Sequence, residues 1–404
     1  MPHETATRLR GFGTTIFAEM TALAARTGAI NLGQGFPDED GPRPVVEAAA
    51  AALLAGPNQY TPARGIPELR AAVAVHARRW YGRELDPDTQ VQVTVGATEG
   101  IAAALLGVLE PGDAVVTLEP YYDSYAAGIA MAGAERRTVA LRPPAFGLDV
   151  DALRAAVRGE RDGAARGTGP GARPGAGKAA RALVLNSPHN PTGKVFDRDE
   201  LEQIAAVCRE FDLVAICDEV YEHLAFDVPH VPLATLPGMA ERTLTVSSAG
   251  KTFALTGWKV GWVTGPPDLV TAVATAKQFL TFSGHGPLQH AVAGALALDD
   301  AFFAAARDTL RARRDRLCAG LEAAGLTTYV PQGGYFAVVD VASIGEPDGA
   351  AFCRSLPERC GVVGVPVSVF CDDPDLGRSL VRFAYCKRED VIDDAASRLA
   401  GLRG

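Results

Sequence analysis

A lysine follows a short apolar run in the segment LTVSSAGKTFALTGWK, which spans residues 244–259. Two motifs that place a lysine in a reactive site are incomplete here. A phosphate-binding P-loop that ends at this lysine would need a glycine where the chain has Thr245. A serine hydrolase of the penicillin-binding type would use Ser248 and Lys251, but the Ser-Asp-Asn and Lys-Thr-Gly motifs that complete such a site do not occur. The chemistry of this lysine must therefore be judged from other residues.

A third interpretation is a Schiff-base lysine for pyridoxal phosphate. That chemistry also needs a partner for the pyridine nitrogen, donors to the phenolic oxygen, a phosphate site and a cation for the substrate carboxylate. Asp218 follows the apolar run 214–217, and a carboxylate at the C-terminal end of a parallel strand faces the ligand crevice. A helix N-cap is the alternative role for it. Asn190, in the turn NSPHNPTG, and Tyr221 can both donate to a phenolic oxygen.

The whole chain has the composition of a globular enzyme. It has 404 residues, 48% of them hydrophobic, and a net charge of -9. No basic run favours nucleic acid, and no apolar run approaches the roughly 18 residues of a membrane helix. The seven cysteines and seven histidines show no spacing typical of metal ligands or disulfides. We therefore expect a cytoplasmic protein without a metal site.

Short apolar runs alternate with helical patterns along the middle of the chain. The expected strands are 91–95, 114–118, 182–185, 214–217 and 244–246, and a helix is expected over 98–109. This alternation predicts an α/β fold with a mostly parallel sheet between helices. Gly96 opens the expected helix, so its first amides are free to bind an anion.

A change of pattern near residue 291 predicts a second, small C-terminal domain over 291–404. We expect residues 1–42 to form an N-terminal arm and part of this small domain, and 43–290 to form a large domain that would bind the cofactor. The stretch 159–180, rich in glycine and without large apolar residues, is expected to be a flexible surface insertion. A long helix is expected over 308–324.

Together these strings resemble the class I and II aminotransferases, the fold type I group of pyridoxal phosphate enzymes. The resemblance covers nearly the whole chain, through NLGQGFPD (31–38), NQY (58–60), RG (64–65), NSPHNPTG (186–193), DEVY (218–221), SxxK (248–251), Lys259 and VRF (381–383). It implies the fold of that group, in which the C-terminal part and the N-terminal segment build a smaller α+β domain. It also implies pyridoxal 5'-phosphate as cofactor, an amino acid and a 2-oxo acid as substrates, and a homodimer.

The resemblance assigns roles to residues of matching motifs. It implies that Lys251 is the Schiff-base lysine and the catalytic base, assisted by Asp218 and Tyr221. The other cofactor-binding residues that it implies are Gly96, Ala97, Thr98, Tyr122, Asn190, Ser248, Lys259 and, from the neighbouring subunit, Tyr60. Those implied for the substrate are Gly35, Asn190, Arg382 and Phe17. The chain departs from many relatives at Lys259, where they have arginine, and from several at Thr98, where they have tyrosine or serine.

The sequence motifs at 33–42, 122–125 and 382–388 resemble those of one branch of this family, which contains the succinyl-diaminopimelate, kynurenine, glutamine and methionine aminotransferases. We expect N-succinyl-LL-2,6-diaminopimelate as donor and 2-oxoglutarate as acceptor. The other three activities and a cysteine-S-conjugate β-lyase stay open as alternatives. Arg64 is a candidate cation for a distal carboxylate. Four phenylalanines are candidates to line the side-chain pocket: Phe17, Phe36, Phe279 and Phe282.

Overall fold

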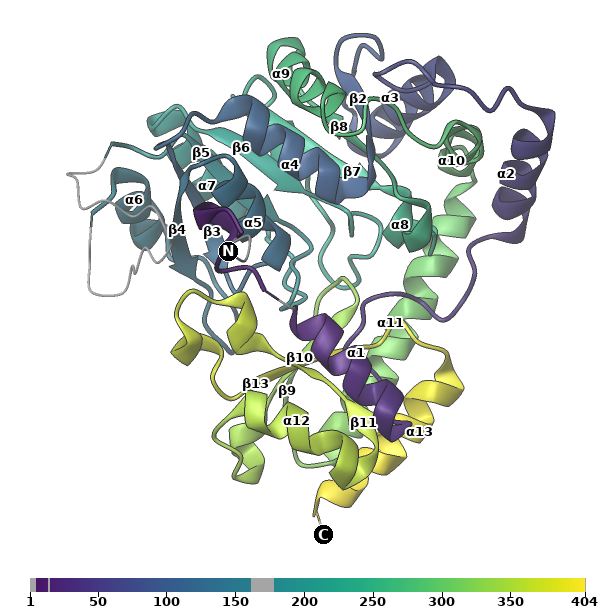
Figure 1. The fold of residues 1–404 in the computed structure, drawn as a ribbon. Coiled ribbons are helices and arrows are strands. Elements are labelled where there is room, and N and C mark those ends of the chain that lie inside the picture. The colour runs from purple at the N-terminus through teal and green to yellow at the C-terminus, as the bar shows by residue number, and fades with distance from the viewer. Residues whose placement is uncertain (1–4, 14, 161–177, 404) are drawn as a thin grey trace, which may run out of the picture.

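The computed structural model describes residues 5–13, 15–160 and 178–403 (Figure 1). Most of the insertion predicted at 159–180 lies outside these residues, so its flexibility stays a prediction. At its C-terminal end, Lys178 Nζ donates a hydrogen bond of 2.8 Å to the Asp113 carboxylate.

A seven-stranded sheet forms the centre of the larger unit, in the upper part of Figure 1. Its strands, in spatial order, are β2 (Val91–Val95), β8 (Val260–Thr264), β7 (Thr243–Ser248), β6 (Val214–Asp218), β5 (Ala182–Asn186), β3 (Ala114–Glu119) and β4 (Glu135–Ala140). All run parallel except β8, which is antiparallel to both neighbours. The predicted α/β fold with a mostly parallel sheet is confirmed.

Alternate residues of the central strands enter different cores, because successive side chains of a strand point to opposite faces. Val115, Val184 and Ile216 pack on one face with three helices: α4 (Gly96–Val108), α5 (Asp123–Met131) and α9 (Pro267–Gln278). Val116 and Leu183 pack on the other face with α6 (Val150–Arg158) and α7 (Arg198–Glu210). The buried strands therefore read as continuous apolar runs.

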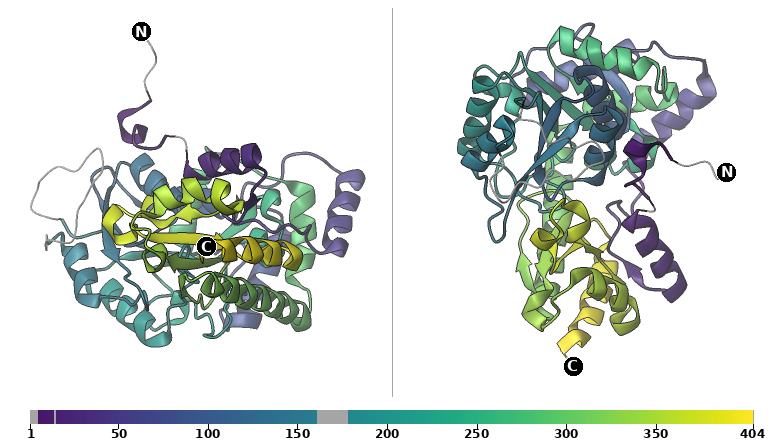
Figure 2. Two further views of the ribbon diagram at one scale, coloured as in Figure 1. Left: turned by 90° about the horizontal axis from the view of Figure 1, so that it is seen from below. Right: turned by 60° about the vertical axis from the view of Figure 1, so that its left-hand side comes forward.

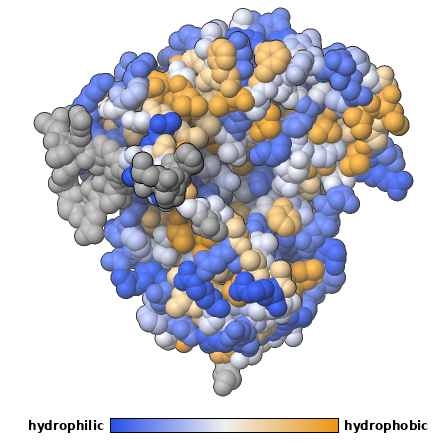
Figure 3. Space-filling view, in the orientation of Figure 1, coloured by the Kyte–Doolittle hydropathy of each residue, from blue (hydrophilic) through white to orange (hydrophobic). Residues whose placement is uncertain are grey.

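The β2 end of the sheet has its own core. Its strands β2 and β8 pack against α2 (Arg43–Ala55), α3 (Pro67–Tyr81), α8 (Ala249–Thr252) and α10 (Gly286–Leu296). Helix α2 extends from the body at the right of Figure 1 and leaves Val46, Leu53 and Leu54 exposed. Figure 3 shows apolar side chains gathered at this edge of the molecule.

The smaller unit is built around an antiparallel sheet of β12 (Val365–Pro366), β13 (Leu380–Ala384), β10 (Phe336–Asp340) and β9 (Thr327–Tyr329). Its helices are α11 (Asp300–Ala323), α12 (Gly349–Cys360) and α13 (Glu389–Leu399). The N-terminal segment joins this unit, because β1 (Ile30–Asn31) pairs with β11 (Val362–Val363) and α1 (Ile16–Thr27) packs on α12. Figure 2 shows α1 beside the C-terminal elements.

The domain limits at 42/43 and 290/291 stay predictions. The second limit falls inside α10, which packs against α2 and α3 of the larger unit. Helix α11 begins at Asp300, eight residues before the predicted start, and runs from Phe303 in the core around β2 and β8 to Leu317 in the core of the smaller unit. Among the described residues, no helix has both the length and the apolar character needed to cross a membrane.

Candidate active site

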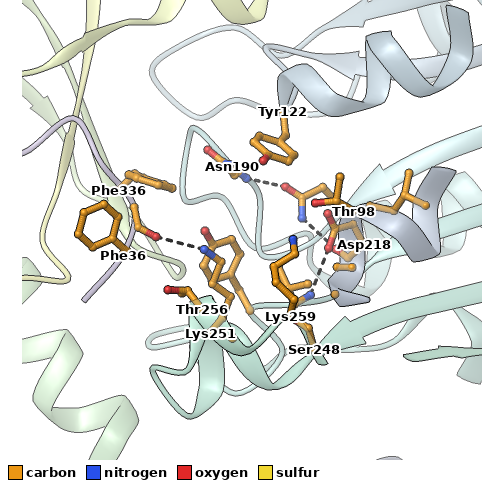
Figure 4. Close-up of a pocket in the computed structure, with 18 of the residues that line it drawn as sticks. Phe36, Thr98, Tyr122, Asn190, Asp218, Ser248, Lys251, Thr256, Lys259 and Phe336 are labelled. Atoms are coloured by element: carbon orange, nitrogen blue, oxygen red, sulfur yellow. Dashed lines mark hydrogen bonds between the residues drawn. The ribbon is translucent and has the colours of Figure 1, made fainter. Parts of the chain in front are cut away.

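A cavity of about 390 Å³ lies between the carboxyl edge of the large sheet and the small sheet (Figure 4). Its lining contains every residue to which the resemblance assigns a role, except Tyr60: Phe17, Gly35, Gly96, Ala97, Thr98, Tyr122, Asn190, Asp218, Tyr221, Ser248, Lys251, Lys259 and Arg382. These residues come from segments far apart in the chain. The ends of parallel strands bring them together.

Lys251 lies in the one-turn helix α8, directly after β7. Its Nζ donates a hydrogen bond of 3.1 Å to the Gly35 carbonyl oxygen and lies over the rings of Tyr221 and Tyr335, 5.7 and 5.3 Å from their centroids. Burial lowers the pKa of this amine and outweighs the opposing effects of Cys386 and Asp218, and the smaller effects of the cations Arg382 and Lys259 add to the lowering. The amine is therefore easier to deprotonate than an exposed lysine.

Asp218 ends β6 and is the register partner of Asn186 on β5. Its Oδ2 accepts a hydrogen bond of 2.5 Å from the Tyr125 hydroxyl, and its Oδ1 accepts one of 3.3 Å from the Val220 amide. Burial raises the pKa of the carboxyl to about 6, although both donors oppose the change. No helix begins in the described residues directly after Asp218, so the N-cap alternative is wrong.

The first turn of α4 lies against Lys259 at one side of the cavity. A Cβ on Gly96, which has a φ of 72°, would lie 3.0 Å from Lys259 Nζ. A Cβ on Gly261 would lie 2.7 Å from the Gly96 carbonyl carbon, so glycine at both positions lets β8 approach the helix start. Ser248 lines the same cavity. Helix amides, a hydroxyl and an ammonium group are suited to a phosphate.

Arg382 projects from β13 and is 1% exposed. Its guanidinium lies between aromatic rings, 3.8 Å from the Phe336 centroid and 4.9 Å from that of Phe370. Nη1 donates to Asn190 Oδ1 and Nη2 to the Gly33 carbonyl oxygen, both at 3.0 Å, whereas the buried Nε has no partner among the described residues. Burial lowers the pKa of this group to about 10, so it stays a cation at neutral pH.

Tyr60 lies outside this cavity. Its side chain is 85% exposed in a separate surface hollow, with its ring 5.5 Å from that of Phe282. Phe17 and Phe36 line the cavity, but the prediction for Phe279 and Phe282 is wrong for a single chain, since both are exposed and neither lines it.

Arg64 also lies outside the cavity. Its Nη2 donates to Thr271 Oγ1 at 3.3 Å. Among the described residues, the cations that line the cavity are Lys251, Lys259 and Arg382. The prediction of Arg64 as a cation for a distal carboxylate is therefore wrong for the cavity of one chain.

Four residues of the site were missed from the sequence. Tyr125 donates to Asp218, Tyr335 lies against Lys251, and Phe336 and Phe370 hold the guanidinium of the buried arginine. For Tyr125 a signal existed, because it follows Tyr122 by three residues and such residues share one side of a helix. The other three come from the small sheet and its neighbouring loops, whose packing on the large sheet no local pattern predicts.

Comparisons with known proteins agree with this arrangement. Residues 27–399 match the model of the family "Aminotransferase class I and II". A probable N-succinyldiaminopimelate aminotransferase of Mycobacterium tuberculosis is 50% identical over 98% of each chain, and the methionine aminotransferase of Escherichia coli is 37% identical over 98% of this chain and 97% of its own. The solved structure of an N-succinyldiaminopimelate aminotransferase from M. tuberculosis superposes with a TM-score of 0.92, at 51% identity, over 99% of this chain and 100% of the other.

The fold and the site thus define a fold type I enzyme of the aminotransferase class. The chain belongs to the class I and II aminotransferases, and it depends on pyridoxal 5'-phosphate. The residues present fit that cofactor. The first turn of α4 with Lys259 offers an anion site that glycines keep open, Asp218 offers a buried acid, and Lys251 offers a buried amine.

Proposed function

We propose that the enzyme transfers an amino group from N-succinyl-LL-2,6-diaminopimelate to 2-oxoglutarate. The observation that carries this proposal is the 50% identity, over 98% of both chains, to the probable N-succinyldiaminopimelate aminotransferase of M. tuberculosis. The cavity of about 390 Å³ lies within the range of ligand pockets, roughly 300 to 1,000 Å³. The apolar rings of Phe17, Phe36 and Phe336 line its small-domain side.

The cofactor supplies an electron sink for the negative charge that develops at the substrate α-carbon. In our proposal, the amides of Ala97 and Thr98 bind its phosphate together with Gly96, Ser248 and Lys259. Asp218 binds the pyridine nitrogen, Asn190 and Tyr221 donate to the phenolic oxygen, and Tyr122 packs on the ring. Support comes from the cavity that these residues line together and from the positive end of α4.

Lys251 is the proposed base. Its amine removes the proton from the substrate α-carbon and returns a proton on the cofactor side. A base works best when its pKa lies near the working pH, and burial lowers the pKa of this lysine toward that range. The contact between Tyr335 Oη and the Lys251 carbonyl oxygen, 2.7 Å, holds the backbone of this turn in place.

Arg382 is the proposed site for the substrate α-carboxylate. Its planar fork suits a carboxylate, and its Nε is not yet engaged by any described residue. Asn190, which accepts from Nη1, and Gly35, which accepts from Lys251, border the same space. The Arg382 guanidinium lies 5.2 Å from the centroid of the Phe17 ring, and this ring limits the space for a substrate on that side.

We also propose a homodimer in which Tyr60 reaches the cofactor phosphate of the partner subunit. Exposed apolar side chains near this residue support an interface: Leu53, Leu54, Phe279, Leu280 and Phe282. Sedimentation should give a dimer. Tyr60→Phe should weaken cofactor binding without changing the mass of the dimer.

We also propose a cytoplasmic location, which the free thiols of all seven cysteines support.

A panel of donors tests the proposed substrate. The succinylated diamino acid, kynurenine, methionine and glutamine are each assayed with 2-oxoglutarate and with other 2-oxo acids, and kcat/KM is compared. The proposal requires the succinylated donor to be preferred by at least about tenfold, the effect of one good polar contact. Preference for methionine or kynurenine would reassign the substrate. Release of pyruvate and ammonia from S-substituted cysteines would identify a β-lyase.

A further inference from the structure

A second cluster of reactive side chains lies behind the active site. His76 is on α3, and Glu222 and His223 follow β6 in the turn that begins after Asp218. One ligand atom of each lies within 4.8 Å of the other two. The two imidazoles face each other through their Nε2 atoms, 2.7 Å apart, although 147 residues separate them in sequence. None of the three lines the cofactor cavity.

The donor types in this cluster suit a cation. Two imidazoles and one carboxylate converge on a single point from separate elements of the chain. Imidazole nitrogens and carboxylate oxygens are common ligands of divalent metal ions.

We propose that His76, Glu222 and His223 form a binding site for one divalent transition-metal ion, with Zn²⁺ as the best match. Two imidazole nitrogens and one carboxylate oxygen are a common donor set for zinc, which leaves a fourth position for water. Two nitrogens on a tetrahedral zinc lie about 3.3 Å apart, so these imidazoles need to separate by only about half an ångström. Within the cluster, His76 is buried and His223 is partly buried.

Neighbouring groups orient the proposed ligands. Tyr81 Oη donates to Glu222 Oε2 at 2.7 Å, and Ser247 Oγ donates to Glu222 Oε1 at 2.5 Å, so the carboxylate is held from two sides. Such contacts position metal ligands and tune them. The nearby cation Arg79 is neutralised by an ion pair with Asp300.

Three other titratable residues near the proposed site, Arg83, His230 and Glu219, make contacts of their own. Arg83 Nη1 donates to Thr245 Oγ1 at 3.3 Å, on the strand that carries Ser247, and a separate hydrogen bond joins His230 Nε2 to Glu219 at 3.0 Å. His230 Nδ1 is buried without a described partner. The proposed ion does not require either residue.

The position of the site indicates a structural role. Its ligands would join α3 to the turn that follows β6, and that turn also holds Asp218 and Tyr221 at the cofactor cavity. An ion that binds only the folded chain raises its stability by mass action. We therefore expect zinc to raise the melting temperature of the holoenzyme and to leave the proposed substrate contacts unchanged.

Metal content tests the proposal. The holoenzyme is dialysed against a chelator, loaded with Zn²⁺, passed through a desalting column and measured by plasma mass spectrometry. Wild type should retain one zinc ion per chain. Glu222→Gln and His223→Gln should bind zinc at least tenfold more weakly, and the exposed His290→Gln is the matched control that should bind like wild type. His223→Cys should recover binding, because a thiolate is also a zinc ligand.

A second readout reports the location. The Trp80 ring lies 4.8 Å from that of His223, so Co²⁺ at this site should quench its fluorescence, and Trp80→Phe should remove most of that response. The proposal is overturned if wild type retains no zinc, or if Glu222→Gln and His223→Gln retain as much as His290→Gln. Quenching that persists in His223→Gln at wild-type Co²⁺ concentrations would place the ion elsewhere.

Discussion

Arg382 Nη1 donates a 3.0 Å hydrogen bond to Asn190 Oδ1, across the boundary between the two sheets. Arg382 belongs to β13 of the small sheet, and Asn190 to the turn after β5 of the large sheet. Arg382, the proposed carboxylate site, is thus hydrogen-bonded directly to Asn190, a proposed cofactor contact. A second bond, from Nη2 to the Gly33 carbonyl oxygen, adds the N-terminal segment to the same junction.

Replacing Arg382 by lysine should damage substrate binding more than cofactor binding. Lysine keeps the charge but loses the fork, and a charged hydrogen bond contributes about 1.5 to 3 kcal/mol. We expect kcat/KM for amino acid donors to fall roughly 100-fold, mainly through KM, with cofactor affinity changed by less than about threefold. Steady-state kinetics and cofactor titration measure both. Arg316→Lys, at an exposed ion pair, is the control and should resemble wild type; an unchanged KM in Arg382→Lys would exclude the proposed role.

Asp218→Asn should make the cofactor-free protein more stable and the enzyme inactive. Burial raises the folded pKa of Asp218 to about 6, from 3.8. Such a group favours folding below pH 3.8, and that contribution is lost as the pH rises through 6. Asparagine should therefore stabilise the apoprotein by up to about 3 kcal/mol at pH 7.5 and by little at pH 4. Urea unfolding at both pH values measures this.

Activity gives the other half of that test. Without the carboxylate we expect kcat to fall at least roughly 100-fold, since a charge that stabilises the reacting state is lost. If Asp218→Asn were equally stable at pH 7.5 and retained full turnover, both the raised pKa and the proposed pairing would be contradicted. Tyr125→Phe should give an intermediate effect, because it removes only the 2.5 Å donor to this carboxylate.

Lys259→Ala should weaken cofactor binding by roughly 10- to 100-fold, the loss expected for one charged contact to a phosphate. Lys259→Arg should retain most of the affinity, because a guanidinium keeps the positive charge and can donate to a phosphate. Cofactor titration of the apoprotein measures both variants. The matched control is Lys178→Ala, whose amine is bonded to Asp113 away from the cavity. Equal affinity in Lys259→Ala and Lys178→Ala would remove Lys259 from the phosphate site.

A buried ion pair connects the two units at a second place. Arg136 Nη2 lies 2.6 Å from Asp372 Oδ1, which also accepts from the Tyr121 hydroxyl at 2.5 Å, and the Asp372 amide donates to Glu119 at 2.7 Å. Asp372→Asn should destabilise the protein by about 3 kcal/mol, because it removes the negative charge that the part-buried Arg136 guanidinium contacts.

Thermal or urea unfolding checks this value. Asp375→Asn is the control, since its pair with Arg378 is solvent-exposed, and we expect a change of less than about 1 kcal/mol. Equal stability of the two variants would show that the buried pair does not hold the units together.

The sequence predicted the strands that lie deepest in the large sheet, because β3, β5, β6 and β7 are buried on both faces and read as apolar runs. It missed β8, whose run VGWVT is buried but interrupted by a glycine, and β4, whose Glu135 and Arg136 sit at the sheet edge and break the pattern. Lys251 and its motif partners Ser248 and Lys259 could be predicted from the sequence because they lie close together in the chain. Contacts such as Tyr335 on Lys251, and the pairing of His76 with His223, depend on tertiary packing that no local pattern encodes.

The central claim is that Lys251 is the amine that holds the cofactor and moves the proton. Borohydride reduction of the holoenzyme followed by peptide mass mapping tests it most directly. We predict that the cofactor mass is found on Lys251 and on neither Lys259 nor Lys277, and that Lys251→Ala carries no covalent cofactor and has lost at least roughly 1,000-fold in turnover. Cofactor attached to another lysine, or full turnover by Lys251→Ala, would contradict the account.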